Sequence, residues 1–360
     1  MSEERKLNLY DGLLEETVSR IQAPDKGAME EAQNRWNAIA HPLHSLGKLE
    51  DMIIQIAGIQ RTSRVKLDKK GLITMCADNG VVEEGVTQTG QEVTAQVAEN
   101  FLSEKATAGI LCRKAGADIF PIDIGIARDT IVRNCKISYG TKNMTKGPAM
   151  TRAEAVKALE TGIALVREKK ADGYRILATG EMGIGNTTTS SALASFFLKQ
   201  PVEKMTGRGA GLTSEGLQRK IDAIRKAIEV NQPDPSDPVD VLAKIGGLDI
   251  AGMAGVFLGG AAEGIPVVID GFISGVAALV ASEICPLSKD YMIASHMSHE
   301  PAADLMMRTL GKDPVLHADM CLGEGTGAVV LFPVLDMALE VYDRMSTFAE
   351  DDIEAYKELK

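Results

Sequence analysis

Two different hydrophobic periods occur along this chain. Over residues 8–59 apolar side chains recur at helical spacing and glycine is sparse, which predicts helices. From residue 71 onward, short β-branched runs alternate with alanine-rich segments. The runs predict strands at residues 71–77, 117–126, 174–178, 265–269 and 291–294. The segments between them predict helices at residues 93–115, 153–168, 190–197, 215–230 and 275–284.

Strands that alternate with helices at this spacing form βαβ units. The sequence therefore predicts an α/β fold, with a mostly parallel Rossmann-like sheet and helices on both of its faces. Three further segments predict a rigid proline-rich loop, a small-residue helix suited to close packing, and a charged helix: residues 232–238, 248–262 and 334–360. We expect residues 1–60 together with 335–360 to form a small helical lobe beside a large α/β domain of residues 61–334.

The charge balance excludes several classes of function. The chain has 39 Lys and Arg against 50 Asp and Glu, a formal net charge of −11, and only 4% aromatic residues. Binding to nucleic acid or anionic membranes needs clustered basic side chains, and base stacking needs aromatic ones. We therefore expect no nucleic-acid and no membrane partner. A small anionic ligand is compatible with this charge, because a few backbone amides bind it locally.

Cysteine usage and apolar runs bear on the compartment. The five cysteines are scattered and form no Cys-x-x-Cys pair, which argues against a disulfide scaffold or a structural zinc site. The charged N-terminal segment lacks the apolar region of a signal peptide, and no apolar run approaches the roughly 20 residues of a membrane helix. We accordingly expect a reduced, cytoplasmic protein.

Polar or glycine-rich clusters lie at or just after the end of each of the five predicted strands. Four of them, residues 78–80, 179–186, 270–271 and 295–300, come after their strands, and the fifth, residues 123–125, lies at the end of the strand predicted at 117–126. In an open parallel sheet, ligands bind outside the carboxyl ends of the strands. Five such clusters in one chain therefore predict a ligand-binding crevice at that edge.

Two glycine loops suit a phosphate group. Gly183 and Gly185 let the backbone approach a ligand closely, and Asn186 is suited to cap the helix that follows. Residues 207–211 form the second loop, and Lys220 follows it inside the next predicted helix. Free amides and the helix dipole attract anions, so the two loops together favour a phosphorylated ligand. Each loop alone is equally consistent with an ordinary connection between elements.

Glu324 is flanked by glycine on both sides, in the run Gly-Glu-Gly-Thr-Gly of residues 323–327. Its neighbours have little bulk, so a ligand can reach the carboxylate, and partial burial would raise its pKa toward the range of a general base. The alternative is a glutamate that stabilises the dipole at a helix N-terminus.

Two other kinds of site lack the residues they need. His296 and His299 lie three residues apart without further ligands nearby, so no metal site is expected. A dinucleotide-dependent oxidoreductase would need Gly-x-Gly-x-x-Gly after the first strand, where this chain has Asp78-Asn79-Gly80.

Seven motifs, in order along nearly the whole chain, resemble those of the nicotinate-nucleotide:dimethylbenzimidazole phosphoribosyltransferases. They are ADNGVVEEGV (77–86), QEVT (91–94), EMGIGNTT (181–188), GRG (207–209), DGFIS (270–274), ASH (294–296) and LGEGTG (322–327). This family moves phosphoribose from nicotinate mononucleotide to an aromatic base. It releases nicotinate, inverts the anomeric carbon from β to α, and so makes the lower-ligand nucleotide of cobamides, the vitamin B12 group. The resemblance implies a glycosyltransferase of the pentosyltransferase class with an α/β core, a helical lobe from both chain ends and a dimeric assembly, and with no cofactor and no metal.

The same resemblance implies roles for individual residues. Glu324 would take the proton from the incoming base, and Glu181 would balance the positive charge that develops on the sugar. The phosphoribosyl side is implied to comprise Glu181, Gly183, Asn186, Thr187, Gly207, Gly209, Lys220 and Ser298, with Asp270 beside it. The acceptor side is implied to comprise Asn79, Thr87, Gln88, Gln91 and Leu322.

The acceptor side departs from the family pattern in two places. Asn79 stands where the family has histidine, and residues 87–90 replace a segment that contributes an aromatic ring to the base pocket. Losing that ring and gaining small polar groups favours a changed acceptor, so a purine or a phenol joins benzimidazole as a candidate. Relatives that activate phenol or p-cresol are heteromers, so we expect a homodimer or a heterodimer with a similar chain. A non-catalytic partner subunit is the remaining alternative, and the intact Glu324 argues against it.

Overall fold

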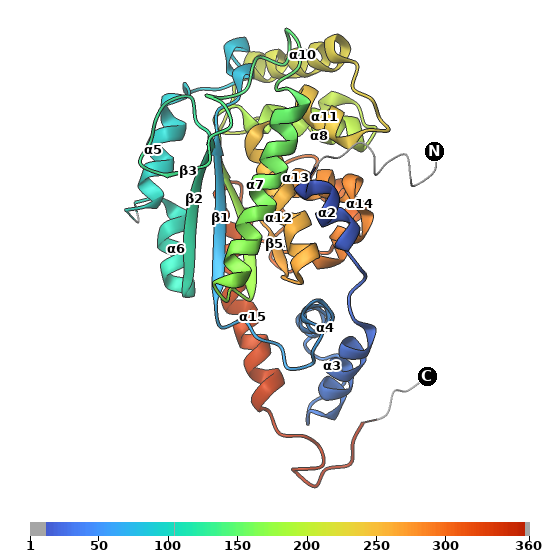
Figure 1. The fold of residues 1–360 in the computed structure, drawn as a ribbon. Coiled ribbons are helices and arrows are strands. Elements are labelled where there is room, and N and C mark those ends of the chain that lie inside the picture. The colour runs from blue at the N-terminus through green and yellow to red at the C-terminus, as the bar shows by residue number, and fades with distance from the viewer. Residues whose placement is uncertain (1–11, 104, 357–360) are drawn as a thin grey trace.

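A parallel sheet runs through the centre of the molecule (Figure 1). The structure is a computed structural model and describes residues 12–103 and 105–356. Its strands are β1 (Lys70–Ala77), β2 (Ala117–Gly125), β3 (Arg133–Asn134), β4 (Ile176–Met182), β5 (Val267–Ile269) and β6 (Met292–Ala294). Within the described residues they lie in the order β3-β2-β1-β4-β5-β6, and every neighbouring pair is parallel. This order is the Rossmann order with its switch point between β1 and β4, which confirms the predicted fold.

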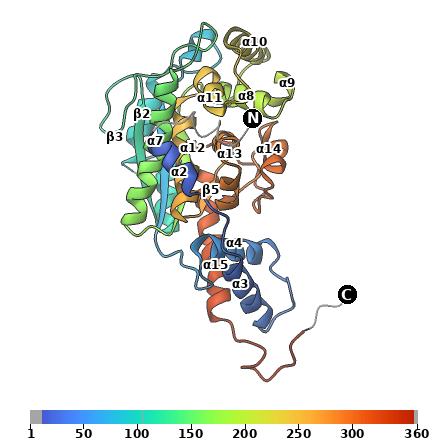
Figure 2. The same ribbon diagram turned by 45° about the vertical axis from the view of Figure 1, so that its right-hand side comes forward.

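Helices cover both faces of the sheet (Figures 1 and 2). One face carries α7 (Arg152–Ala171), α12 (Leu248–Glu263) and α13 (Phe272–Ile284), with α8 (Asn186–Phe197), α10 (Ser214–Asn231) and α11 (Pro238–Ile245) toward one end. The other face carries α5 (Glu92–Phe101), α6 (Thr107–Ala115) and α15 (Thr326–Arg344), with α4 (Lys48–Gln60) packed on α15. The other α-helices of the described residues are α2 (Leu13–Arg20), α3 (Lys26–Ala38), α9 (Val202–Met205) and α14 (Ala303–Leu310).

Each face of the sheet has its own hydrophobic core. Along β1, Ile73 and Met75 pack into the core under α7 and α12, whereas Leu72 and Cys76 pack into the core under α6 and α15. All four side chains are fully buried. Successive side chains of a strand point to opposite faces, and a strand covered on both faces needs apolar residues at every position. Because both faces of the sheet are covered, its strands appear in the sequence as continuous apolar runs.

The close packing of α7 against α12 depends on glycine. A Cβ atom at Gly255 would overlap the carbonyl oxygen of Leu159, and one at Gly162 would overlap the carbonyl oxygen of Gly252. The two backbones therefore touch without intervening side chains. This contact confirms that the helix predicted at residues 248–262 is adapted to close packing.

Two predicted helices differ from those in the structure. The segment 93–115 forms two helices, α5 and α6, because Ala106 has an extended backbone and starts a new helix. The predicted C-terminal helix ends at Arg344, and residues 345–356 contain no helix. Their backbone pairs instead with the end of α3, where the amide of Phe348 donates to the carbonyl of Ala38 over 2.9 Å. Residues 357–360 lie outside the described part of the chain.

The proline-rich segment also ends earlier than predicted. Pro238 is the first residue of α11, and the side chain of Asp237 accepts hydrogen bonds from the amides of Val239 and Asp240. Proline suits this position because its missing N–H is not needed at the first turn of a helix. Helices α9, α11 and α14 are additions to the prediction.

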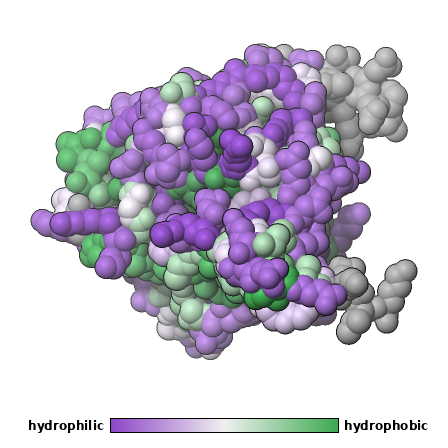
Figure 3. All heavy atoms as spheres, turned by 90° about the horizontal axis from the view of Figure 1, so that it is seen from below, coloured by the Kyte–Doolittle hydropathy of each residue, from purple (hydrophilic) through white to green (hydrophobic). Residues whose placement is uncertain are grey.

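Near the chain ends, α3 packs on α4, and α4 contacts α15 (Figure 2). Helix α2 contacts α7 and α12 instead. The division into a lobe of residues 1–60 with 335–360 and a domain of residues 61–334 stays a prediction, and residues 1–11 and 357–360 lie outside the described structure. None of the helices that the structure describes combines the length and apolar character needed to span a bilayer. Seen from below, hydrophilic residues cover most of the surface, and apolar residues form separate patches (Figure 3).

We predict that Gly255→Ala lowers the free energy of unfolding by about 1–3 kcal/mol, because the added methyl group forces the backbones of α7 and α12 apart. Urea unfolding measures the change. Gly27→Ala is the matched control, since Gly27 is an exposed helical glycine in α3 and should lose no stability. Equal unfolding midpoints for the two variants would contradict the close-contact interpretation.

Candidate active site

The polar residues predicted to meet at the carboxyl edge of the sheet do so for four strands. Asn79 follows β1, Glu181 ends β4, Asp270 follows β5, and His296 and Ser298 follow β6. All five side chains are buried. This edge is where an open parallel sheet binds its ligands.

The cluster at the end of β2 has a structural partner instead. Asp123 forms a buried ion pair with Lys136, with 3.0 Å between its Oδ2 and Nζ, and it accepts a hydrogen bond from Thr130. The positive charge of Lys136 therefore already balances the negative charge of this carboxylate. The five predicted clusters thus include one that holds a loop together.

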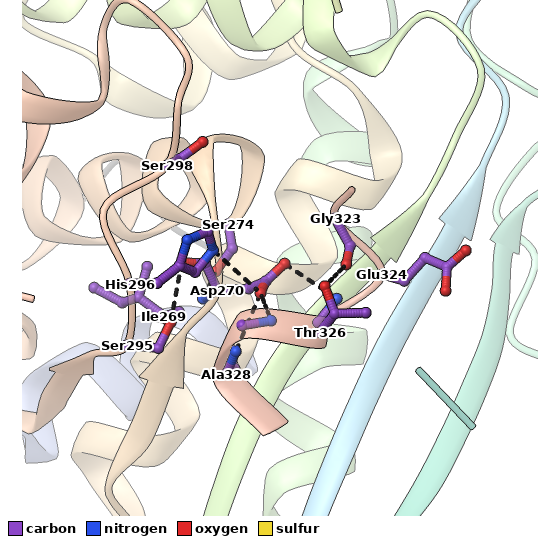
Figure 4. Close-up of polar contacts among 12 residues, drawn as sticks. Ile269, Asp270, Ser274, Ser295, His296, Ser298, Gly323, Glu324, Thr326 and Ala328 are labelled. Carbon is purple, nitrogen blue, oxygen red and sulfur yellow. Dashed lines mark hydrogen bonds and ion pairs between the residues drawn. The ribbon is translucent and has the colours of Figure 1, made fainter. Parts of the chain in front are cut away.

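Glu324 lies in a turn of unusual backbone conformation. Gly323, Glu324 and Gly325 have φ angles of 89°, 61° and 88°, all in the left-handed region. Glycine adopts this region freely, and glutamate does so only at an energetic cost. The amide of Glu324 donates to Oε1 of Glu181 over 3.3 Å, and Asp270 accepts the amide of Gly325 over 3.1 Å. Figure 4 shows this turn beside Asp270.

The carboxylate of Glu324 points away from Asp270 toward the first strands of the sheet (Figure 4). Its Oε2 accepts the amide of Ala108, at the start of α6, over 3.1 Å. Burial raises the pKa of Glu324, and the amide of Ala108 opposes that rise. Glu324 does therefore lie at a helix N-terminus, but at that of α6. The start of α15, the helix that follows it in sequence, is occupied by Asp270.

Glu181 belongs to a buried group of polar side chains. The Nδ2 atom of Asn186 donates to Glu181, and also to Asp249 over 3.0 Å. Burial raises the pKa of Glu181 to about 8, with a further contribution from the charge of Asp249. Burial likewise raises the pKa of Asp249 to about 6. One carboxamide thus links two acidic groups that have lost their hydration.

Asp249 is a site residue that the sequence prediction omits. It is the second residue of α12 and is completely buried. The available signal is an acidic residue inside an otherwise apolar, small-residue segment. Such a residue, once buried, must have a partner.

The two glycine loops meet at Lys220. Its Nζ donates to Oγ1 of Thr187 over 2.9 Å and to the carbonyl of Gly207 over 3.1 Å. A Cβ atom at Gly209 would lie 3.0 Å from Oγ1 of Thr187 and 3.6 Å from Nζ of Lys220. Burial lowers the pKa of Lys220 to about 8, while the nearby charge of Glu300 raises it. A buried cation beside the backbone amides of a glycine loop is suited to bind a phosphate group.

The first glycine loop leads directly into a helix. Gly185, with φ 97°, precedes α8, and the amide of Asn186 donates to the carbonyl of Gly183 over 3.0 Å. A side chain at Gly183 would overlap the carbonyl oxygen of Ala77. The loop therefore needs glycine for close backbone packing as well as for any approach to a ligand. Ser298 lies near this edge, and its Oγ accepts the amide of Glu300 over 3.4 Å.

The predicted acceptor residues are held by one another and by the second glycine loop. Nε2 of Gln88 donates to the carbonyls of Ala210, over 3.2 Å, and of Gly211. Nε2 of Gln91 donates to the carbonyl of Asn79 over 3.3 Å. The acceptor segment is thus attached to the loop that meets Lys220.

The other predicted acceptor residues differ in exposure. Asn79 is fully buried, with its Oδ1 at 3.5 Å from Oγ1 of Thr189, whereas Leu322 is 56% exposed beside the Glu324 turn. Oγ1 of Thr87 donates to the carbonyl of Thr89 over 2.8 Å and so stiffens its own segment. Leu322 is the one large apolar group of this set that faces solvent.

Within the described residues, no three His, Cys, Asp or Glu side chains are placed to hold a metal ion. His296 is buried beside Asp270, whereas His299 is exposed and lies 3.9 Å from Asp319. The two histidines therefore have separate surroundings.

Comparison with known proteins defines the class. The phosphoribosyltransferase family profile matches residues 21–353. A nicotinate-nucleotide–dimethylbenzimidazole phosphoribosyltransferase of Desulforamulus reducens is 48% identical over 343 residues, 94% of this chain and 98% of that relative. The enzyme of the same name from Ruminiclostridium cellulolyticum is 47% identical over 349 residues, 96% of this chain and 99% of that relative.

A solved structure agrees with these relatives. The structure of a nicotinate-nucleotide–dimethylbenzimidazole phosphoribosyltransferase from Thermus thermophilus superposes with a TM-score of 0.86 at 36% identity, covering 92% of this chain and 99% of that one. The protein is thus a phosphoribosyltransferase, an enzyme of the pentosyltransferase class. It belongs to the family of the nicotinate-nucleotide–dimethylbenzimidazole phosphoribosyltransferases.

The burial of Glu181 predicts a pH dependence of stability. Folding raises its pKa from 4.5 to about 8, so the folded chain binds this proton more tightly than the unfolded chain. The resulting stabilisation is complete below the unfolded pKa and is lost as the pH rises through the folded pKa. Between about pH 6 and 8 we expect Glu181 to lower the free energy of unfolding by up to about 1.4 kcal/mol per pH unit.

Urea unfolding at a series of pH values measures this slope, and Glu181→Gln is the comparison because glutamine does not titrate. The variant should have a flatter profile over that range. Asp249, with a pKa of about 6, contributes its own slope at lower pH in both proteins. Profiles that run parallel from about pH 6 to 8 would contradict the assigned burial of Glu181.

Proposed function

We propose that this chain transfers phosphoribose from nicotinate mononucleotide to an aromatic base, releases nicotinate, and forms the α-riboside 5′-phosphate used as a cobamide lower ligand. The observation that carries the proposal is the position of Glu324. This partly buried carboxylate is held in a left-handed turn at the carboxyl edge of the sheet, next to Glu181. The names of the relatives supply the donor and the acceptor class.

The phosphate of the donor would lie where the two glycine loops meet. Lys220 would supply positive charge there, together with Thr187 and the amides at Gly207 and Gly209. The lowered pKa of Lys220 rises again when a phosphate dianion approaches, because an opposite charge favours the protonated amine. Binding would thus charge the lysine fully.

The ribose and its leaving group would lie next to Glu181. In nicotinate mononucleotide the ring nitrogen carries a positive charge, so the C–N bond breaks without an acid to protonate it. Positive charge then develops on the sugar, which favours the ionised form of Glu181 and is balanced by it. Asn186 holds the Glu181 carboxylate in place.

The acceptor would enter beside Glu324. A ring nitrogen of the base attacks the anomeric carbon, and the proton on its other nitrogen passes to the Glu324 carboxylate. The raised pKa of Glu324 makes it a stronger base than an exposed glutamate. Attack from the face opposite the departing nicotinate gives the inverted, α configuration.

The acceptor itself is best assigned to the benzimidazole class, because the relatives at 46–48% identity carry that name. A purine and a phenol remain alternatives, because Asn79 and the segment 87–90 depart from the family pattern at the acceptor side. A phenolic hydroxyl titrates near pH 10, so its transfer would depend still more on Glu324. The relatives that activate phenols suggest a second, similar subunit for that activity.

A product assay tests the proposed reaction. The purified, folded chain alone receives nicotinate mononucleotide together with dimethylbenzimidazole, adenine, phenol and p-cresol in competition, and mass spectrometry identifies the riboside phosphates. We expect the nitrogen-linked benzimidazole product and one equivalent of nicotinate. A predominant oxygen-linked product would replace this acceptor by a phenol. No product from the folded chain would overturn the proposal and favour a partner-dependent or non-catalytic subunit.

We predict that Glu324→Gln slows turnover by roughly 10²–10⁴-fold, because glutamine keeps the shape of the side chain and cannot accept the proton. Binding of nicotinate mononucleotide, measured by calorimetry, should be unchanged within error. Glu30→Gln is the matched control, since Glu30 is exposed on α3 and should leave turnover as it is. Unchanged turnover of Glu324→Gln would remove Glu324 from the mechanism.

A further inference from the structure

The turn that carries Glu324 has both local hydrogen bonds and amides that need a partner from elsewhere in the chain. Residues 323–325 have left-handed φ angles, and the turn is closed locally by Thr326, which donates to the carbonyl of Gly323 from its amide over 3.0 Å and from its Oγ1 over 2.8 Å. Glutamate at the central position adds a steric cost, because its Cβ approaches the following carbonyl oxygen. The local bonds leave the amides of Gly325, Gly327 and Ala328 without an acceptor in the turn, so these amides need one from elsewhere in the chain.

Asp270 supplies that acceptor. Its Oδ1 accepts the amide of Gly327 over 2.7 Å and that of Ala328 over 3.1 Å, and its Oδ2 accepts the amide of Gly325 over 3.1 Å. These amides would otherwise be unpaired at the start of α15. The side chain is 2% exposed, so its charge is compensated by these donors and by the dipole of α15. Figure 4 shows the carboxylate between β5 and the first turn of α15.

Asp270 is itself fixed by its neighbours. Its backbone amide donates to Oγ of Ser274 over 3.0 Å, and Oγ of Ser295 donates to the carbonyl of Ile269 over 2.6 Å. Nε2 of His296 lies 3.8 Å from Oδ1 on the remaining side. A side chain at Gly327 would overlap the His296 ring, so the helix start fits against this histidine only with glycine.

We propose that Asp270 is a positioning residue, whose carboxylate holds the turn at residues 323–325 so that Glu324 faces the acceptor. The inference rests on the proposed role of Glu324. It differs from the resemblance, which places Asp270 beside the phosphoribosyl group. Its hydrogen bonds in the structure go to the start of α15, so its effect on transfer passes through Glu324.

A double-mutant cycle tests this coupling. Asp270→Asn replaces one acceptor oxygen by an NH₂ group that faces an amide donor, which loosens the turn. We expect a loss in kcat of about 10²-fold, the size that a misplaced catalytic group produces, with the KM for nicotinate mononucleotide changed by less than about twofold. In the Glu324→Gln background the same substitution should cost less than about threefold, because the group that it positions is already absent.

Asp123→Asn is the matched control for general destabilisation. Asp123 is also a buried aspartate near the end of a strand, and its partners are Lys136, Thr130 and the amide of Ile126 rather than residues of the Glu324 turn. This variant should lose thermal stability and keep its kcat. Ser295→Ala serves if Asp270→Asn does not fold, because it loosens the Asp270 support while leaving the carboxylate. Its loss in kcat should be smaller and should likewise disappear in the Glu324→Gln background.

The outcomes separate this inference from the proposed function. An equal loss from Asp270→Asn in both backgrounds, or a raised KM with unchanged kcat, would show that Asp270 acts on the substrate directly and would overturn the inference. If Glu324→Gln alone leaves turnover unchanged, the proposed role of Glu324 fails instead. A loss in kcat of Asp123→Asn comparable to that of Asp270→Asn would also overturn the inference, since general loosening would then explain both.

Discussion

Three carboxyl groups are buried where β4, β5 and α12 meet. The surrounding residues supply the hydrogen-bond donors that these groups lose from water when they are buried. Glu181, Asp249 and Asp270 are each at most 7% exposed. Burying a charge without partners costs far more than a single hydrogen bond returns. The partners here are Asn186, the amides of the turn at residues 323–325 and the amides of the first turn of α15. A change to any one of these groups leaves another without its partner.

The same requirement explains how residues far apart in sequence form one site. Glu181 and Glu324 are 143 positions apart and are joined by a hydrogen bond from a backbone amide. The break between α5 and α6 brings a third distant group, the amide of Ala108, to the Glu324 carboxylate. The parallel sheet makes this convergence achievable, since all its strands end at the same edge.

The edge has two ends with different chemistry. At one end Lys220 joins the glycine loops, and at the other Glu324 presents a partly buried carboxylate; we assign phosphate binding to the first and proton transfer to the second. Gln88 ties the predicted acceptor segment to the second glycine loop. The predicted acceptor segment therefore lies against the same loop that contacts Lys220.

The strand positions, the Rossmann-like sheet and the glycine-flanked Glu324 follow from local sequence, because alternation, apolar runs and glycine placement act over a few residues. The contrast between Asp123 and Asp270 does not. Asp123 lies near the carboxyl end of β2 and Asp270 directly follows β5, yet Asp123 pairs with Lys136 while Asp270 accepts amides at the start of α15. The burial of Asp249 and the break in the segment 93–115 are of the same kind. Their partners come from other elements, and contacts between distant elements leave no local pattern, so they arise only when the chain has folded.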